Sequence, residues 1–227
     1  MRINKKDLSG MKIKTCFIII FLASVAAAYA VDDKEFKAKQ KDLKAPAVSE
    51  RLAAVQWFAA VQSTESTKVL MDQFASEKSN MVKISIIKAW TIQHSPDALK
   101  AILSALNDPN EDVRNRAVIN LAYFGNSREI MQALSSLLEN EQEEKVQKSA
   151  LNTLRTYNDD RASDEIIKVS RDKEKKELRK FAVKSLRNLS SARAKNELKI
   201  LEKDKDAEIS AAAKGKDAVP DKKKGKK

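Results

Sequence analysis

Apolar residues recur along most of the chain at helical spacing, and the pattern itself repeats five times. The five segments are ERLAAVQWF (50–58), VKISIIKAW (82–90), VRNRAVINL (113–121), VQKSALNTL (146–154) and LRKFAVKSL (178–186). In the third, Val113, Ala117 and Leu121 lie at i, i+4 and i+8, on one face of an α-helix. Such a stripe cannot be buried by one helix alone, so we expect the copies to stack.

The second place of each segment holds a polar or basic residue, and these residues fix the period. They are spaced by 32, 31, 33 and 32 positions: Arg51, Lys83, Arg114, Gln147 and Arg179. A second helix is expected after each segment, over 66–74, 97–106, 128–138, 162–170 and 192–201. Ser95-Pro96-Asp97 and Gly125-Asn126-Ser127 carry the clearest start signals for these helices.

The chain is poor in turn residues, with 4 Gly and 4 Pro in 227 positions. Strand-rich folds need turn signals every 8 to 12 positions, roughly. The fold class expected is therefore all-α, an α-solenoid of about five antiparallel helix pairs with a period of about 32.

One stretch resembles a known repeat. LNDPNEDVRNRAVINLAYFGN, residues 106–126, is similar to the short HEAT-like repeat of bacterial and phycobilisome-lyase-type proteins, and the other four segments match less closely. The features shared are Asp108-Pro109, Val113-Arg114, Ala117, Leu121 and Gly125. In that family the basic residue binds a carboxylate or carbonyl of the adjacent turn, forming a ladder. The resemblance implies a structural role for Arg51, Lys83, Arg114 and Arg179, and a weakened rung at Gln147.

The N-terminus carries an export signal. Residues 1–14 hold five Lys/Arg and one acid, Cys16 to Ala30 are uncharged, and small residues Ala28 and Ala30 precede Val31. This is the pattern of a signal peptide cleaved between Ala30 and Val31. The apolar stretch is shorter than the roughly 20 residues of a membrane span. An uncleaved anchor, a start at Met11 and acylation of Cys16 are the alternatives.

The predicted organisation has four parts: a signal peptide (1–30), an N-terminal capping segment (31–46), the solenoid (47–205), and a partial cap with a disordered Lys-rich tail (206–227). The formal net charge is +12, of which the leader carries +4 and the segment from Lys203 to Lys227 another +4. The body is therefore only mildly basic.

No constellation of catalytic or metal-binding residues is evident. His94 is the only histidine and stands in a turn, and Cys16 is the only cysteine and lies in the leader. A zinc site needs a cluster of such ligands, and no Gly-rich phosphate loop occurs. The sequence therefore predicts no enzymatic activity and no cofactor.

Five residues are candidates for binding a partner. Trp57 has Ala89, Asn120, Thr153 and Ser185 at the equivalent positions, which suggests a position bordering solvent. Coverage of Trp57 by Phe36 of the capping segment is the favoured interpretation, and an exposed binding residue is the alternative. The second helices usually line the concave side of a solenoid. Their polar residues outside the repeat pattern are Gln132, Ser135, Lys168 and Lys199.

These features favour a protein–protein interaction scaffold in the periplasm or outside the cell, with an unidentified protein partner and no nucleic acid. A spacer that touches anionic envelope surfaces through Lys222–Lys227 is the runner-up. A bilin- or small-ligand-handling role, implied only by the lyase-type resemblance, is the third reading.

Overall fold

The computed structural model describes residues 32–216, and all the regular structure in that range is helical. Five helix pairs are flanked by a single helix at each end. The elements are α2 (Asp33–Asp42), α3 (Val48–Val61), α4 (Thr64–Ser76), α5 (Asn80–Gln93), α6 (Pro96–Ala105), α7 (Glu111–Leu121), the 3₁₀ turn η1 (Ala122–Phe124), α8 (Arg128–Asn140), α9 (Glu144–Tyr157), α10 (Asp160–Arg171), α11 (Lys176–Leu186), α12 (Ala192–Leu201) and α13 (Ala207–Ala213).

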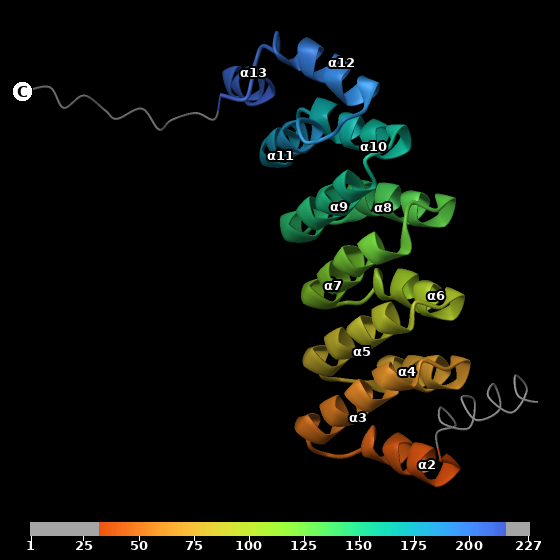
Figure 1. The fold of residues 1–227 in the computed structure, drawn as a ribbon. Helices are drawn as coiled ribbons and strands as arrows, with labels where there is room; N and C mark the ends of the chain where they lie inside the picture. Colours follow the sequence, from red (N-terminus) through yellow and green to blue (C-terminus); the bar gives the residue numbers. More distant parts are fainter. Residues whose placement is uncertain (1–31, 217–227) are drawn as a thin grey trace, which may run out of the picture.

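The pairs stack one on another into an elongated α-solenoid, which confirms the predicted fold class (Figure 1). The first helices of the pairs (α3, α5, α7, α9, α11) lie along one side and the second helices (α4, α6, α8, α10, α12) along the other. The core runs between the two rows. Val113, Ala117 and Leu121, the predicted stripe of α7, are fully buried in it.

A serine or aspartate begins each second helix, at a spacing of 32 residues. The side chain of each accepts a hydrogen bond from the backbone N–H three positions on: Ser63, Ser95, Ser127, Asp159 and Ser191. Such an N-cap contributes about 1 kcal/mol to helix stability. These caps explain why the second helix of every pair starts at the same place in the repeat.

The basic residues of the first helices connect successive turns. Arg114 binds the Glu141 carboxylate through Nε and Nη2 at 2.7 and 2.8 Å, and its Nη1 donates to the Asp108 and Pro109 carbonyls. Arg51 repeats this arrangement with Glu77, Ala45 and Pro46. Each arginine thus connects two turns, the one that precedes its own helix and the one that follows the second helix of the same pair.

Lys83 and Arg179 form the same kind of rung. Lys83 Nζ lies 2.7 Å from Asp108 Oδ2, and Arg179 binds Asp204 and the Ser170 carbonyl. The carboxylates then accept backbone N–H groups at the start of the next first helix; Glu141 Oε1, for example, accepts from Gln142 and Glu143. We call the set Arg51–Glu77, Lys83–Asp108, Arg114–Glu141 and Arg179–Asp204 the ladder.

The fourth pair lacks a charged rung. Gln147 donates to the carbonyls of Leu138 and Glu141, as the arginines do on that side. Asp172 stands where the ladder carboxylate would be and accepts the Glu174 N–H, but no ion pair within residues 32–216 involves it. The stack is therefore held less firmly between α9 and α11.

The ladder carboxylates are more acidic than usual. The hydrogen bond from Arg114 lowers the pKa of Glu141 below the ordinary 4.5, against the effect of burial. Burial alone would raise the pKa of Glu77, but the bonds from Arg51, Ser79 N–H and Gln73 outweigh it and lower that pKa. Hydrogen bonds from Asp206 N–H and Arg179 similarly overcome burial and lower the pKa of Asp204.

Three first helices end on a residue in the left-handed conformation. Gln62, His94 and Asn158 have φ of 40°, 48° and 49°, and Gly125 occupies the equivalent place in the third pair. A side chain in this conformation costs roughly 1–2 kcal/mol, which glycine avoids.

Replacing Arg114 by Gln should lower the free energy of unfolding by about 3 kcal/mol, because the buried Glu141 carboxylate loses its cation. Urea denaturation measures this change. Arg193→Gln, which breaks the exposed pair with Asp164, is the control and should cost less than about 1 kcal/mol. Equal effects of the two substitutions would show that the ladder is not a principal source of stability.

The protein should lose stability in acid. The pKa values of Glu77, Glu141 and Asp204 are lower in the folded chain than the ordinary 4.5 and 3.8. These carboxylates therefore contribute their full stabilisation at pH values above the ordinary pKa values. That stabilisation is lost from about pH 5 downward, as the pH falls through the pKa values of the folded chain. Urea midpoints measured from pH 7 to pH 3 test this. An Arg114→Gln/Glu141→Gln variant should show a shallower decline, and an identical decline would contradict the assignment.

Gln62→Gly should raise the free energy of unfolding by about 0.5–1 kcal/mol, since it relieves the left-handed strain at a position with an exposed side chain. Asn158→Gly is the matched control. Asn158 Oδ1 accepts the Ser190 N–H and hydroxyl at 2.9 and 3.1 Å. Loss of these two hydrogen bonds in Asn158→Gly should cancel the stability gained from relief of the left-handed strain. Thermal melts compare the two, and destabilisation by Gln62→Gly would refute the strain argument.

Candidate interaction surface

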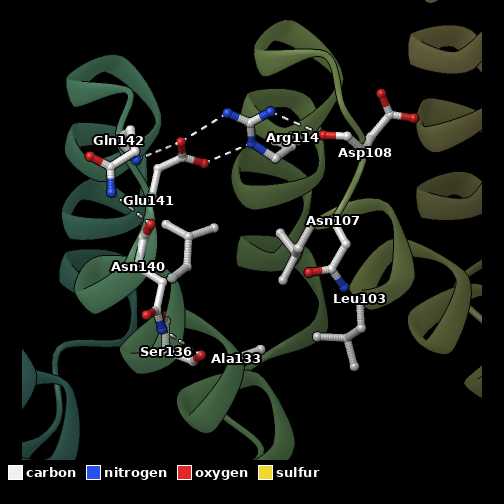
Figure 2. A pocket seen from close by; sticks show the side chains of 11 residues that line it. Leu103, Asn107, Asp108, Arg114, Ala133, Ser136, Asn140, Glu141 and Gln142 are labelled. Atoms are coloured by element: carbon white, nitrogen blue, oxygen red, sulfur yellow. Dashed lines mark hydrogen bonds and ion pairs between the residues drawn. The ribbon is translucent and has the colours of Figure 1, made fainter.

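A groove opens between the second helices α6 and α8, and we call it the α6–α8 groove. Its volume is about 520 Å³ (Figure 2). Its lining comes from α6, α7, α8 and the turns that follow α6 and α8: Leu103, Leu106, Asn107, Asp108, Arg114, Ala133, Ser136, Leu137, Asn140, Glu141 and Gln142.

The floor of the groove is apolar and its rim carries amides. Leu106 and Leu137 are buried and Leu103 and Ala133 half-buried, whereas Asn107, Ser136, Asn140 and Gln142 are exposed. Asn140 donates to the Ser136 carbonyl at 2.8 Å, and Gln142 donates to the Asn140 carbonyl at 3.2 Å. The Asn107 side chain forms no hydrogen bond with the described part of the chain. The rim therefore offers both donors and acceptors to a bound chain.

No side-chain hydrogen bond or ion pair joins α6 to α8 within residues 32–216. The next junctions are bridged. Ser135 on α8 donates to Glu165 on α10 at 2.7 Å, and Arg171 and Arg193 pair with Glu197 and Asp164 between α10 and α12. The α6–α8 junction is thus the least cross-linked of these three.

The charges at the groove are compensated. Arg114–Glu141 closes its end, between α7 and the turn after α8, and Arg114 also reaches the Asp108 carbonyl (Figure 2). The Asp108 carboxylate is neutralised by Lys83. A ligand of this groove would consequently meet apolar side chains and neutral amides rather than a net charge.

A smaller groove lies between α8 and α10 and brings together two of the predicted binding residues. Ser135 and Lys168 both bind Glu165, Lys168 Nζ at 2.9 and 3.0 Å. The hydrogen bond to Glu165 raises the pKa of Lys168. The groove has a volume of about 310 Å³ and is also lined by Leu138, Glu139, Val169, Asp172 and Lys175.

The other two candidates on second helices stand apart from both grooves. Gln132 is exposed on α8 and Lys199 is exposed on α12. Neither lines the α6–α8 groove or the smaller one. The structure thus groups Ser135 with Lys168 and separates them from Gln132 and Lys199.

Trp57 lies against the N-terminal helix. Its Nε1–H donates to Glu35 at 3.0 Å, and its ring meets Phe36 edge-on with centroids 6.0 Å apart. The expectation that this repeat position borders solvent is wrong for the inner pairs, where Ala89, Asn120, Thr153 and Ser185 are only 2–5 % exposed. The polar groups there bond across helices, Asn120 to Thr91 and Thr153 to the Val118 carbonyl.

Sequence reasoning missed the amides of the rim. Asn107 and Asn140 both stand directly before a ladder carboxylate, Asp108 and Glu141. An alignment of the repeats on those carboxylates would have shown that an asparagine precedes the carboxylate in both the second and the third repeat. Glu165, which connects Ser135 to Lys168, carries no such signal.

The remaining sequence predictions concern His94, metal binding, membrane spans and the two ends of the chain. His94 is exposed and its ring stacks on Phe124 with centroids 4.6 Å apart. Within residues 32–216 there is no group of three or more His, Cys, Asp or Glu side chains that could hold a metal ion, and no helix there is long and apolar enough to span a bilayer. The cleavage residues Ala28, Ala30 and Val31 and the tail Lys222–Lys227 lie outside the described residues.

Comparison with solved structures finds similar chains at low identity. A crystal structure of an engineered protein is 18 % identical, with a TM-score of 0.43 over 80 % of this chain and 94 % of that one. Human deoxyhypusine hydroxylase in complex with glycerol is 10 % identical, with a TM-score of 0.38 over 81 % and 94 %. No curated protein sequence matches the chain.

The repeats themselves are matched by a family. HEAT repeats match residues 41–122, 99–175 and 131–215, three overlapping segments that span nearly all of the described helices. The helix pairs, their period and the turn-to-turn ladder agree with that match, and the chain belongs to the HEAT-repeat family.

Proposed function

We propose that the protein is an exported, non-catalytic scaffold that binds a partner protein through the row of second helices. HEAT repeats generally mediate protein–protein interaction, and the stacked pairs present a long surface for it. The α6–α8 groove is the observation that carries the proposal. Its floor is apolar, its rim is rich in amides and its charges are compensated.

An extended, uncharged segment of a partner fits these properties best. Apolar side chains of such a segment would bury against Leu103, Ala133 and Leu137, while its peptide groups would bond to the amides of Asn107 and Asn140. Burial of apolar area supplies affinity, and the amides fix orientation. A strongly charged segment would lose hydration there without finding a counter-charge.

Export is the second part of the proposal and rests on the sequence. The basic start, the short apolar run and the small residues Ala28 and Ala30 support removal of the leader and delivery to the periplasm or beyond.

Filling the groove should abolish partner binding. Ala133→Arg places a long side chain across the floor, and the adjacent Gln132→Arg adds the same charge on the exposed surface outside the groove. Tagged protein isolated from an envelope fraction should retain one stoichiometric partner in the wild type and in Gln132→Arg. Retention should fall at least tenfold in Ala133→Arg, with unchanged circular dichroism.

Two results would contradict the proposal. Recovery of no stoichiometric protein would remove the scaffold function, and equal recovery by Ala133→Arg would remove the groove. N-terminal sequencing of the isolated protein tests export independently, since a processed chain begins at Val31 and an unprocessed one at Met1 or Met11.

A further inference from the structure

The outer face of the first helices α5 and α7, with the 3₁₀ turn η1 that follows α7, carries most of the large apolar side chains that the described chain exposes. Four of the six lie there, and they are Met81 (62 % exposed), Ile92 (55 %), Ile119 (37 %) and Tyr123 (67 %). We call these four residues the outer patch. The helices α5 and α7 belong to the row of first helices, opposite the row of second helices, and lie in the middle of the stack (Figure 1).

The outer patch is confined to α5, α7 and η1. Ile92 and Tyr123 occupy the same place in the repeat, nine residues after Lys83 and Arg114. In the neighbouring pairs that place holds Ala60 and Thr156. The position that Ile119 occupies in its repeat is taken by Gln56 and Asn152 in the same two neighbouring pairs. The fold therefore tolerates small or polar residues at these positions, and packing does not account for the apolar ones.

Cations without partners lie among the apolar side chains. Lys88 stands one turn before Ile92 on α5, and Arg116 precedes Ile119 on α7. Neither forms an ion pair with another described residue. α5 has no acidic residue, and of the two on α7, Asp112 is bound to Lys145 of α9 and Glu111 is half-buried. The face is apolar and positive.

We propose that the outer patch docks an acidic amphipathic helix of a partner protein. From Met81 to Ile92 the patch extends along α5 for roughly 16 Å, the length of about three helical turns. A partner helix lying alongside would place apolar residues at i, i+3, i+4 and i+7 against the patch. Its flanking carboxylates would pair with Lys88 and Arg116, which favours acidic partners.

Two other occupants fit less well. A symmetric pair of copies would bring Lys88 and Arg116 of both chains to one interface, where like charges repel. A bilayer would need the apolar side chains to project together beyond the cations, whereas here Lys88 lies between Met81 and Ile92 along the helix. The inference goes beyond the α6–α8 groove, because it concerns the opposite side of the solenoid and a different partner chemistry.

Three 18-residue helical peptides with the same leucine stripe and with glutamate, glutamine or lysine flanks are the probes. The purified protein should bind the glutamate peptide at least tenfold more tightly than the lysine peptide, by fluorescence anisotropy. The difference should narrow as sodium chloride is raised from about 50 to about 500 mM. Ile92→Ala/Tyr123→Thr, which installs residues used at that place in α3 and α9, should weaken binding at least tenfold with an unchanged melting temperature.

Met71→Ala/Ile200→Ala removes the other two exposed apolar side chains, on α4 and α12, and should leave binding unchanged. The proposal is overturned if the glutamate peptide does not bind, shows no preference over the lysine peptide, or binds the Ile92→Ala/Tyr123→Thr variant equally well. Sedimentation with phosphatidylglycerol vesicles that is lost in that variant would assign the patch to a bilayer instead. Dimerisation lost in the same variant would assign it to a second copy.

Discussion

The bond between a basic residue of each first helix and the carboxylate after its pair is the constraint on which the stack depends. A helix pair buries one face against its neighbours, but burial alone is non-directional and does not fix how far one pair rotates over the next. Arg114 sets that relation, because it holds the Asp108 and Pro109 carbonyls on one side and the Glu141 carboxylate on the other. Glu141 in turn accepts the N–H groups of Gln142 and Glu143 in the turn that leads into the next first helix, so each rung positions the following one.

The repeat and the fold could be predicted from the sequence because their causes are local and recur. The stripe in each first helix and the capping residues at Ser95 and Ser127 are visible within a few positions of one another. The same 32-residue spacing, extended in both directions from Ser95 and Ser127, identifies the other capping residues Ser63, Asp159 and Ser191. Because the pattern occurs five times, a misread position in one repeat does not change the predicted fold.

The grooves and the environment of Trp57 were not predictable in this way, because they depend on contacts between different pairs. Polar residues such as Asn120 and Thr153 suggested solvent, but they are buried and bonded to the preceding first helix. Trp57 has no such helix before it among the described residues and packs on Phe36 instead. The α6–α8 groove is lined by residues of two successive pairs, and the sequence of either pair alone does not show it.

The rung at Gln147 gives the solenoid uneven mechanical properties. A stack of repeats transmits bending in series, since each pair touches only its neighbours, and deformation concentrates where the restoring contacts are weakest. Here that place is the junction between α9 and α11, where Asp172 forms no ion pair with another residue of the described range. The chain should therefore bend as two stiffer blocks, one containing the first four pairs and the other the fifth pair with α13. A partner that contacts both blocks would select one curvature from the range this hinge permits.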